Sequence, residues 1–417
     1  MPQEATNAQA LYKGLLSLAV YRRVLQRPVT SLLAGMLRAC LKGDEDTVCS
    51  NYGELCSLLI RDGRPEGLAF AVAREVLSDE NAFTIELAKG ARGFVPDELL
   101  ALAKRDLNIL YRAATSSVEL AASHLPAAFE GLPPLYEGPH DNSYPFTGRW
   151  DECIGRLGEY HRKNGVGIFT LHNAFLWYNH DITPIIHPDP TRLNELKNYE
   201  EQRRVAIDNT LAFLDRYPAN NMLLYGDRGT GKSSTVKGLL NEYADRGLRM
   251  IEMPKETLSQ LPELTSRLAR IPMRFIVFID DLSFSGSDDN FAALKAVLEG
   301  GLASRPENVL IYATSNRRHL LRESFSDRSG DEVHHADTVQ ESVSLSDRFG
   351  IFLTFLMPDK RGFFDIVEQL AADYRLDIER EALLRGAEQW ALERGGRSPR
   401  FARQYIDDLR ARLKHDC

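Results

Sequence analysis

Cysteine is scarce in this sequence, and the few residues present form no metal-binding or disulfide pattern. The five cysteines are spread over 417 residues, and no two of them form a Cys-x-x-Cys pair. Cysteine-based zinc sites typically show paired cysteines at short, fixed spacings, and disulfide scaffolds show an even, dense set of cysteines in a short chain. We therefore expect reduced thiols, and neither a zinc site nor a disulfide framework.

Long apolar runs are also missing. A membrane-spanning helix needs about 20 consecutive apolar residues, whereas the longest candidates here, residues 275–279 and 351–357, have the length of a strand. Residues 11–25 are interrupted by Lys13, Arg22 and Arg23 and do not have the layout of a secretory signal. We expect a cytoplasmic protein with no membrane partner.

There is no excess of positive charge. Lys and Arg number 51 against 59 Asp and Glu, which gives a formal net charge of −8. This balance argues against non-specific nucleic-acid binding by the whole chain, although a local basic groove stays possible. The hydrophobic (43%) and charged (26%) fractions are those of a globular protein, and the length exceeds one ordinary core.

Composition divides the chain into four parts. Residues 1–145 have helical apolar spacing and end in a linker rich in Pro and Gly, which predicts a helical accessory domain. Residues 146–195 form a bridging segment, with a strand or hairpin expected at 167–178. Residues 196–357 alternate apolar strands with helical segments, which predicts an α/β core with a parallel sheet. Residues 358–417 are helical again, and we expect a small lid of helices at 363–374, 379–394 and 399–413.

The strongest chemical pattern is a Gly-x-x-x-x-Gly-Lys-Ser motif after an apolar run, followed by a helix-forming segment. This order is typical of a Walker A phosphate-binding loop, in which glycines let backbone N–H groups approach a triphosphate. We expect Lys232 at the β/γ-phosphates and the Ser233 hydroxyl on Mg²⁺. A chance glycine-rich turn is the alternative. The predicted nucleotide-binding residues are Gly226, Asp227, Arg228, Gly229, Thr230, Gly231, Lys232, Ser233 and Ser234.

Two carboxylates, Asp280 and Asp281, follow the apolar run 275–279. A buried strand that ends in acids is typical of a Walker B element. Asp280 would hold Mg²⁺, and Asp281 would orient and deprotonate the attacking water. Two acids at a strand end can also form a solvated turn. The usual residue at the second position is Glu, and Asp281 is one methylene shorter.

Asn316 follows the next apolar strand, residues 309–313, at the end of a Thr-Ser-Asn sequence. A polar side chain at this point can hydrogen-bond the attacking water and the γ-phosphate, although the same sequence also suits a helix cap or a turn.

Two arginines complete the candidate site. Arg348 precedes the strand 351–355, and its position suits an arginine finger that acts on the γ-phosphate of a neighbouring subunit. The alternative is a surface ion pair, worth about 0–1 kcal/mol. Arg400 lies in the first turn of a helix that we expect to start at Pro399 with Ser398 as its N-cap, and it could face the phosphates. Arg397 and Arg403 are its rivals.

Weaker features have structural explanations that we prefer. His172 and His180 lack a third ligand, and the polar stretch 323–341, with His334 and His335, is expected to be a solvated loop rather than a metal site. Ile185 or Tyr199, near the start of the predicted helix 193–217, is a candidate for contact with a nucleotide base.

Taken together, these motifs resemble an AAA+ ATPase over residues 184–413. The stretches Tyr-Gly-x-Arg-Gly-Thr-Gly-Lys-Ser-Ser, Asp-Asp-Leu-Ser-Phe and Tyr-Ala-Thr-Ser-Asn-Arg-Arg-His-Leu are most similar to a bacterial AAA+ family known only as domain of unknown function 815. The resemblance implies a P-loop αβα sandwich with a C-terminal helical lid, and binding and hydrolysis of ATP with Mg²⁺.

Because Arg348 would complete a site across an interface, we also expect a homo-oligomer. We expect it to remodel a macromolecular partner, which the resemblance does not identify. A protein client, a DNA-associated role like that of helicase loaders, and a nucleotide switch with little turnover all stay open. Arg317, Arg318 and the basic residues near the C-terminus are the only support for nucleic acid.

Overall fold

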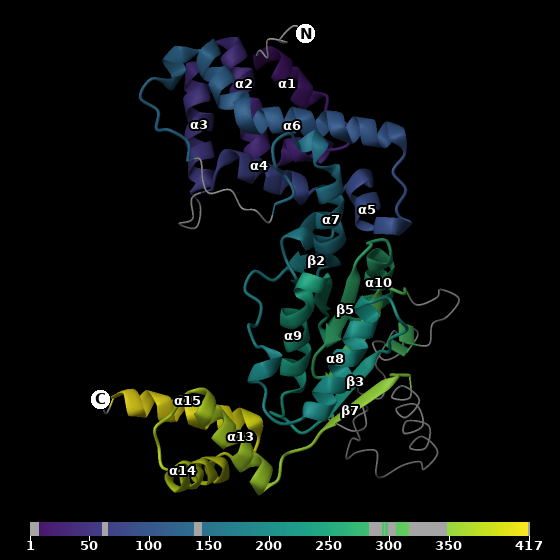
Figure 1. Cartoon of the computed structure of the whole chain (residues 1–417), viewed down its shortest axis with the longest axis vertical. Coiled ribbons are helices and arrows are strands. Elements are labelled where there is room, and N and C mark those ends of the chain that lie inside the picture. Colours follow the sequence, from purple (N-terminus) through teal and green to yellow (C-terminus); the bar gives the residue numbers. More distant parts are fainter. Residues whose placement is uncertain are drawn as a thin grey trace. The chain divides into compact units, whose positions relative to one another are not determined.

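The computed structural model describes residues 8–60, 66–136, 144–282, 294–295, 297–298, 306–316 and 348–415. The chain forms two compact units, Met1–Leu171 and His172–Cys417 (Figure 1). The finer boundaries expected near residues 145, 195 and 357 stay predictions.

The described part of the first unit is helical, as expected from its apolar spacing. The long helix α6 packs against α1, α2 and α4 (Figure 1). Leu15, Leu37, Leu107 and Leu110 are fully buried in the shared core. The α-helices are α1 (Ala8–Leu16), α2 (Pro28–Lys42), α3 (Glu45–Leu59), α4 (Leu68–Leu77), α5 (Ala82–Ala88), α6 (Asp97–His124) and α7 (Ile154–Asn164).

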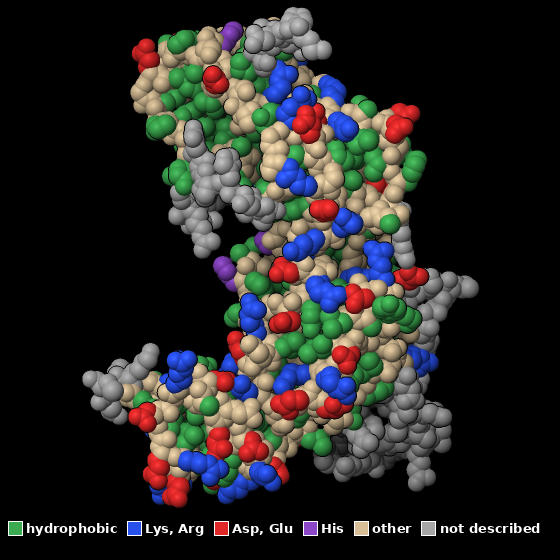
Figure 2. Space-filling model, in the orientation of Figure 1, with side chains coloured by type: hydrophobic (Ala, Val, Ile, Leu, Met, Phe, Trp, Pro, Cys, Tyr) green, Lys and Arg blue, Asp and Glu red, His purple; other side chains and the backbone are tan. Residues whose placement is uncertain are grey.

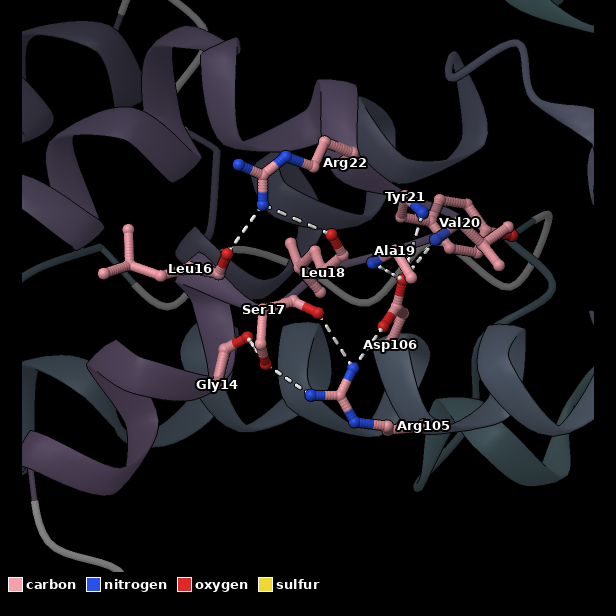
Figure 3. Close-up of polar contacts among 10 residues, drawn as sticks. All are labelled: Gly14, Leu16, Ser17, Leu18, Ala19, Val20, Tyr21, Arg22, Arg105 and Asp106. Atoms are coloured by element: carbon pink, nitrogen blue, oxygen red, sulfur yellow. Dashed lines mark hydrogen bonds and ion pairs between the residues drawn. The ribbon is translucent and has the colours of Figure 1, made fainter.

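A buried carboxylate on α6 fixes the loop that follows α1. Asp106 is fully buried, and its Oδ2 accepts backbone N–H bonds from Ala19, Val20 and Tyr21 at 2.8, 2.8 and 3.1 Å (Figure 3). The Arg105 guanidinium contacts Asp106 Oδ1 at 3.1 Å and donates to the Ser17 carbonyl at 3.0 Å. Because backbone N–H groups left unpaired in a core are costly, this carboxylate stabilises the turn. This role of Asp106 was not predicted from the sequence.

Glu75 on α4 does the same for the start of α2. Its carboxylate accepts from the backbone N–H groups of Val29 (2.8 Å) and Thr30 (2.9 Å), which the first turn of a helix cannot pair internally. Burial raises the pKa of Glu75. The N-terminal helices are therefore joined by buried carboxylate-to-backbone bonds as well as by apolar packing.

His161 on α7 makes the stability of this unit depend on pH. It is fully buried, its Nδ1 donates to the Gly165 carbonyl at 2.7 Å, and its Nε2 has no partner in the described part of the chain. Burial lowers the pKa of His161 to about 4, against about 6.5 in an unfolded chain. The unfolded state therefore binds the proton first, and the stabilisation is lost as the pH falls from about 6.5 towards 4.

We expect lowering the pH from about 7 to about 5 to remove about 2 kcal/mol of unfolding free energy through His161 alone. The variant His161→Asn keeps a donor for Gly165 and does not titrate. Denaturant unfolding of both proteins at the two pH values measures the difference. Equal pH dependence in wild type and variant would contradict this assignment.

The second unit is built on a seven-stranded sheet of order β2-β1-β4-β5-β6-β3-β7. All of its pairs are parallel except the β1–β2 hairpin. Within the stretch 167–178, where a strand or hairpin was expected, residues 174–178 form β1, whereas residues 167–170 form a 3₁₀ turn. β1 pairs with β2 and adds an antiparallel edge to the predicted parallel sheet. The strands are β1 (Ala174–Tyr178), β2 (Asp181–Pro184), β3 (Met222–Gly226), β4 (Leu248–Glu252), β5 (Arg274–Ile279), β6 (Val309–Ser315) and β7 (Ile351–Phe355).

The sheet is combined with helices α8 (Glu200–Leu214), α9 (Lys232–Tyr243) and α10 (Leu261–Ala269). The predicted helix 193–217 was wrong at its start. Residues 193–195 form a separate 3₁₀ turn, and α8 begins only after Asn198 and Tyr199, whose φ angles of 65° and 60° cannot continue a right-handed helix.

The predicted C-terminal lid is confirmed as a bundle of α13 (Lys360–Asp373), α14 (Arg380–Glu393) and α15 (Pro399–His415). Phe363, Ala387 and Ile406 are fully buried in its core. The Ser398 hydroxyl accepts from the Phe401 N–H at 3.3 Å, so the expected N-cap of α15 is present. The parallel core, its lid and the helical N-terminal region confirm the predicted α/β fold class of AAA+ P-loop proteins. In the described residues, no helix has the length and apolar character required to traverse a bilayer.

Candidate functional site

The glycine-rich loop lies at the carboxyl end of β3, between that strand and α9. β3 is bordered by β6 and β7, and ligands of open α/β sheets bind beyond the carboxyl ends of such strands. Gly226 has φ 135°, and a Cβ there would lie 2.1 Å from the Phe355 carbonyl oxygen. Only glycine fits this close approach, so the loop geometry expected from the motif is present.

Lys232, the first residue of α9, points back into the loop. It is 6% exposed, and its Nζ donates to the carbonyls of Gly226 (2.9 Å) and Asp227 (2.7 Å) and to Asn316 Oδ1 (3.0 Å). Burial lowers the pKa of Lys232, while the nearby Asp227, Asp280 and Asp281 oppose that shift. A nearly buried ammonium group therefore lies at the phosphate-binding loop.

The predicted metal-ligating residues lie side by side. Ser233 Oγ donates to Asp280 Oδ1 at 2.6 Å, and the Thr314 hydroxyl, at the end of β6, donates to the same oxygen at 2.5 Å. Hydroxyl and carboxylate oxygens are the hard ligands that Mg²⁺ prefers, so this donor set fits that ion. Thr314 was missed as a site residue, although it belongs to the Thr-Ser-Asn sequence that was noted.

Asp281 and Asn316 also meet. Asn316 Nδ2 donates to Asp281 Oδ1 at 2.6 Å, while its Oδ1 accepts from Lys232. Asp281 has a left-handed backbone (φ 51°), and its N–H donates to the Thr314 hydroxyl at 3.0 Å. The ends of β5 and β6 therefore hold an acid and an amide in contact with each other, and the amide also contacts the loop lysine. Their roles in hydrolysis stay predictions.

A cavity of about 710 Å³ opens over these groups. Its walls come from the loop, from the strand ends, from the segment before α8, and from the lid. Arg400 lines it, and the Arg400 N–H donates to the Gly229 carbonyl at 3.1 Å. The loop residues from Arg228 to Thr235 line it as well. The cavity is large enough for a nucleotide, since ligand pockets commonly measure about 300–1,000 Å³.

The rival arginines and base contacts separate in the structure. Arg403 also lines the cavity and lies 3.7 Å from Glu195, whereas Arg397 pairs with Glu388 at 2.5 Å and is not among the lining residues. Tyr199 lines the cavity. Ile185 instead borders a smaller space of about 220 Å³ behind α9.

Arg348 lies near the amino ends of the strands, whereas the phosphate-binding loop lies at their carboxyl ends. It precedes β7, and Ile351 at the start of β7 is in register with Met222 at the start of β3, whereas the phosphate-binding loop follows the end of β3. Arg348 is half-buried and does not line the cavity of its own chain. Any action on a phosphate would therefore involve another subunit's cavity.

His172 and His180 make structural contacts in the described part of the chain. His180 Nδ1 pairs with Glu263 at 2.8 Å, and His172 packs edge-on against Phe175. Across the described ranges there is no group of three His, Cys, Asp or Glu residues placed to hold a metal ion. The stretch 323–341, with His334 and His335, lies outside the described residues, as do Arg317 and Arg318. Among the described residues, Cys40, Cys49, Cys56 and Cys153 are free thiols.

A family model described as a protein of unknown function (DUF815) matches residues 170–413, more than half of the chain. The chain belongs to this family. The match confirms the resemblance to this family that the sequence motifs indicated. It includes the sheet, the cavity and the lid. Residues 1–169 lie outside it.

Other likenesses are partial. The replication factor C large subunit of Nanoarchaeum equitans (strain Kin4-M) is 37% identical over 114 residues, which is 26% of this chain and 26% of that protein. Two solved structures also align. The RuvB Holliday junction branch migration motor of Thermotoga maritima has a TM-score of 0.35 and 17% identity over 54% of this chain and 67% of that one. The FIGL-1 AAA domain in complex with ADP has a TM-score of 0.33 and 18% identity over 48% and 67%. At these values, what those proteins bind or do does not transfer to the DUF815 protein.

Proposed function

We propose that this protein is a Mg²⁺-dependent AAA+ ATPase that couples binding and hydrolysis of ATP to the remodelling of a macromolecular partner. The observation that carries the proposal is the meeting of Lys232, Ser233, Asp280, Asp281 and Asn316 at one cavity, which the lid residue Arg400 also lines. These groups come from two strand ends and two helix starts, and together they supply the charges that phosphoryl transfer requires.

In this proposal, Lys232 exchanges its three protein acceptors for phosphate oxygens, and Arg400 adds a second positive charge from the lid. Ser233 and Asp280 hold Mg²⁺, which would neutralise charge that develops on the phosphates. Asp281 accepts the proton of the attacking water, and Asn316 orients that water. Hydrogen bonds join Lys232 to Asn316, Asn316 to Asp281, and Ser233 to Asp280.

A second candidate is a nucleotide-dependent switch or scaffold with little turnover. Two features of Asp281 favour this candidate. Its side chain is shorter than the usual Glu, and its carboxylate accepts a hydrogen bond from Asn316 at 2.6 Å. A base held in this way reaches less far towards a water. Single-turnover hydrolysis separates the two candidates.

We also propose a homo-oligomer, because Arg348 can contact a γ-phosphate only in a neighbouring subunit's cavity. The partner is a protein client or a nucleic acid. The helicase-loader-like alternative depends on basic residues of the lid, but Arg410 and Arg412 pair with Asp407 (3.6 Å) and Asp408 (2.6 Å). Figure 2 accordingly has basic and acidic side chains intermixed on the visible face of the lid. This mixture favours a protein client.

The test is hydrolysis and oligomer size measured together on the full chain, with ATP and with ADP, in Mg²⁺ and in EDTA. We expect phosphate release only with Mg²⁺, and a larger assembly with ATP than with ADP. Hydrolysis stimulated by DNA, with a steep salt dependence, would instead support the nucleic-acid alternative. A monomer in ATP with normal turnover would contradict the shared site.

A further inference from the structure

Residues 354–357, the end of β7 and the two residues after it, lead from the core towards the lid and are held by side chains of the core. The Tyr199 hydroxyl donates to the Leu356 carbonyl at 2.5 Å, and Gln202 Nε2 donates to the Thr354 carbonyl at 3.0 Å. The Tyr199 ring also packs on Phe355, with 4.9 Å between ring centroids. We call residues 354–357 the core–lid linker. Its position is therefore determined by groups that include Tyr199, which also borders the nucleotide cavity.

The phosphate-binding loop itself contacts this linker through Asp227. Asp227 Oδ2 accepts the N–H of Met357 at 2.6 Å, and the Asp227 N–H donates to the Phe355 carbonyl at 2.9 Å. Asp227 and Met357 are 130 positions apart in the sequence. One loop residue thus binds the linker on both sides of Leu356.

A carboxylate is an unexpected group in a loop that is built to bind anions. Like charges repel, so Asp227 by its charge alone would weaken the binding of a triphosphate. Its side chain is not among those that line the cavity, and it bonds a backbone N–H of the linker instead. Because a hydrogen bond to a charged acceptor is stronger than a neutral one, the charge has a structural use at this position.

The same loop also contacts the start of α15, the last helix of the lid. The Gly229 carbonyl accepts the N–H of Arg400 at 3.1 Å, and a Cβ on Gly229 would lie 3.0 Å from Ser398 Oγ and 3.3 Å from Arg400 Cβ. The loop residues from Gly226 to Gly229 therefore bond both the segment that enters the lid and the first turn of α15.

We propose that Asp227 is a positioning residue, which holds the core–lid linker so that Arg400 faces the phosphates and so that the lid follows the conformation of the loop. This inference rests on the proposed function, since it assigns Asp227 a part in the same ATPase site. Asp227 acts through the linker and through Arg400, and its side chain does not itself touch the nucleotide.

In Asp227→Ala we expect ATP affinity and kcat to respond differently. Removing the negative charge relieves repulsion, so ATP affinity stays the same or rises. Releasing the linker lets Arg400 move away, so kcat falls about ten-fold or more. Asp227→Asn keeps an acceptor for Met357 without the charge and is expected to recover most of kcat.

The experiment measures ATP affinity, kcat and amide hydrogen exchange of peptides that cover residues 354–357, on the full chain with Mg²⁺. It compares wild type, Asp227→Ala, Asp227→Asn and the control Asp215→Ala. Asp215 forms an exposed pair with Arg246 at 2.5 Å and does not line the cavity. We expect faster exchange of the linker and a lower kcat in Asp227→Ala only.

Four outcomes are decisive. A kcat of Asp227→Ala equal to that of wild type would overturn the proposal, and so would a ten-fold loss of ATP affinity, because Asp227 would then act on nucleotide binding. If wild type neither binds nor hydrolyses ATP, the proposed function fails, and the failure is visible before any variant is compared. Slower exchange or unchanged exchange of the linker in Asp227→Ala would also overturn the proposal.

Discussion

Lys232→Ala is expected to weaken ATP binding by about 100-fold or more. The ammonium group is nearly buried at the base of the loop, where its charge is poorly screened by water and where its present partners are two carbonyls and one amide oxygen. A charged donor to phosphate oxygens in such a site contributes about 3 kcal/mol, which corresponds to about two orders of magnitude in affinity. Titration of full-length protein with a fluorescent ATP analogue measures the change.

Lys237→Ala is the matched control for this experiment. Lys237 lies on the same helix, α9, but it faces Asp189 at 3.5 Å and does not line the nucleotide cavity. Its loss should leave ATP affinity within about three-fold of wild type, the effect of one exposed ion pair. Equal affinity of wild type and Lys232→Ala would overturn the assignment of the loop as a phosphate site.

Arg348→Ala is expected to reduce kcat by about 10³–10⁵ while leaving ATP affinity nearly unchanged. The reason is geometric. Arg348 lies near the start of β7, and the loop lies beyond the end of β3, so in the proposed homo-oligomer the two would meet across an interface between subunits. An arginine that meets the γ-phosphate only in the assembled site stabilises the charge that develops during transfer.

Mixing Arg348→Ala with Lys232→Ala tests whether the site is shared. Each variant is inactive by itself, but the first has an intact cavity and the second an intact arginine. Mixed oligomers therefore contain some complete sites, and activity should return on mixing. Normal hydrolysis by Arg348→Ala at every protein concentration would refute the shared site, and so would the absence of recovery in oligomers shown to be mixed.

Features set by local spacing could be predicted from the sequence. Gly226 and Gly231 needed backbone angles that other residues rarely adopt, and Asp280 and Asn316 each followed an apolar strand. Because parallel strands end at one edge of a sheet, the contact between Asn316 and Asp281 follows from the order of these motifs. Ser398 as the N-cap of α15 was likewise readable from its place before Pro399.

Features set by long-range pairing could not be predicted. Asp106 bonds backbone groups 85 to 87 residues away, and Asp227 bonds the linker 130 residues away. Neither carboxylate differs in its local sequence from an ordinary exposed acid. The start of α8 was also missed, because the left-handed angles at Asn198 and Tyr199 accompany the contact of Tyr199 with Leu356 and do not follow from local propensity.

The central claim, that this DUF815 chain hydrolyses the ATP it binds, is tested most directly by a single-turnover assay. Full-length protein in excess over radiolabelled ATP is incubated with Mg²⁺, and nucleotide recovered from the complex is separated into ATP and ADP. We predict conversion of the bound ATP to ADP and phosphate in wild type, and none in Lys232→Ala. Recovery of the bound nucleotide as intact ATP from oligomeric wild-type protein would contradict the ATPase assignment and would favour the switch.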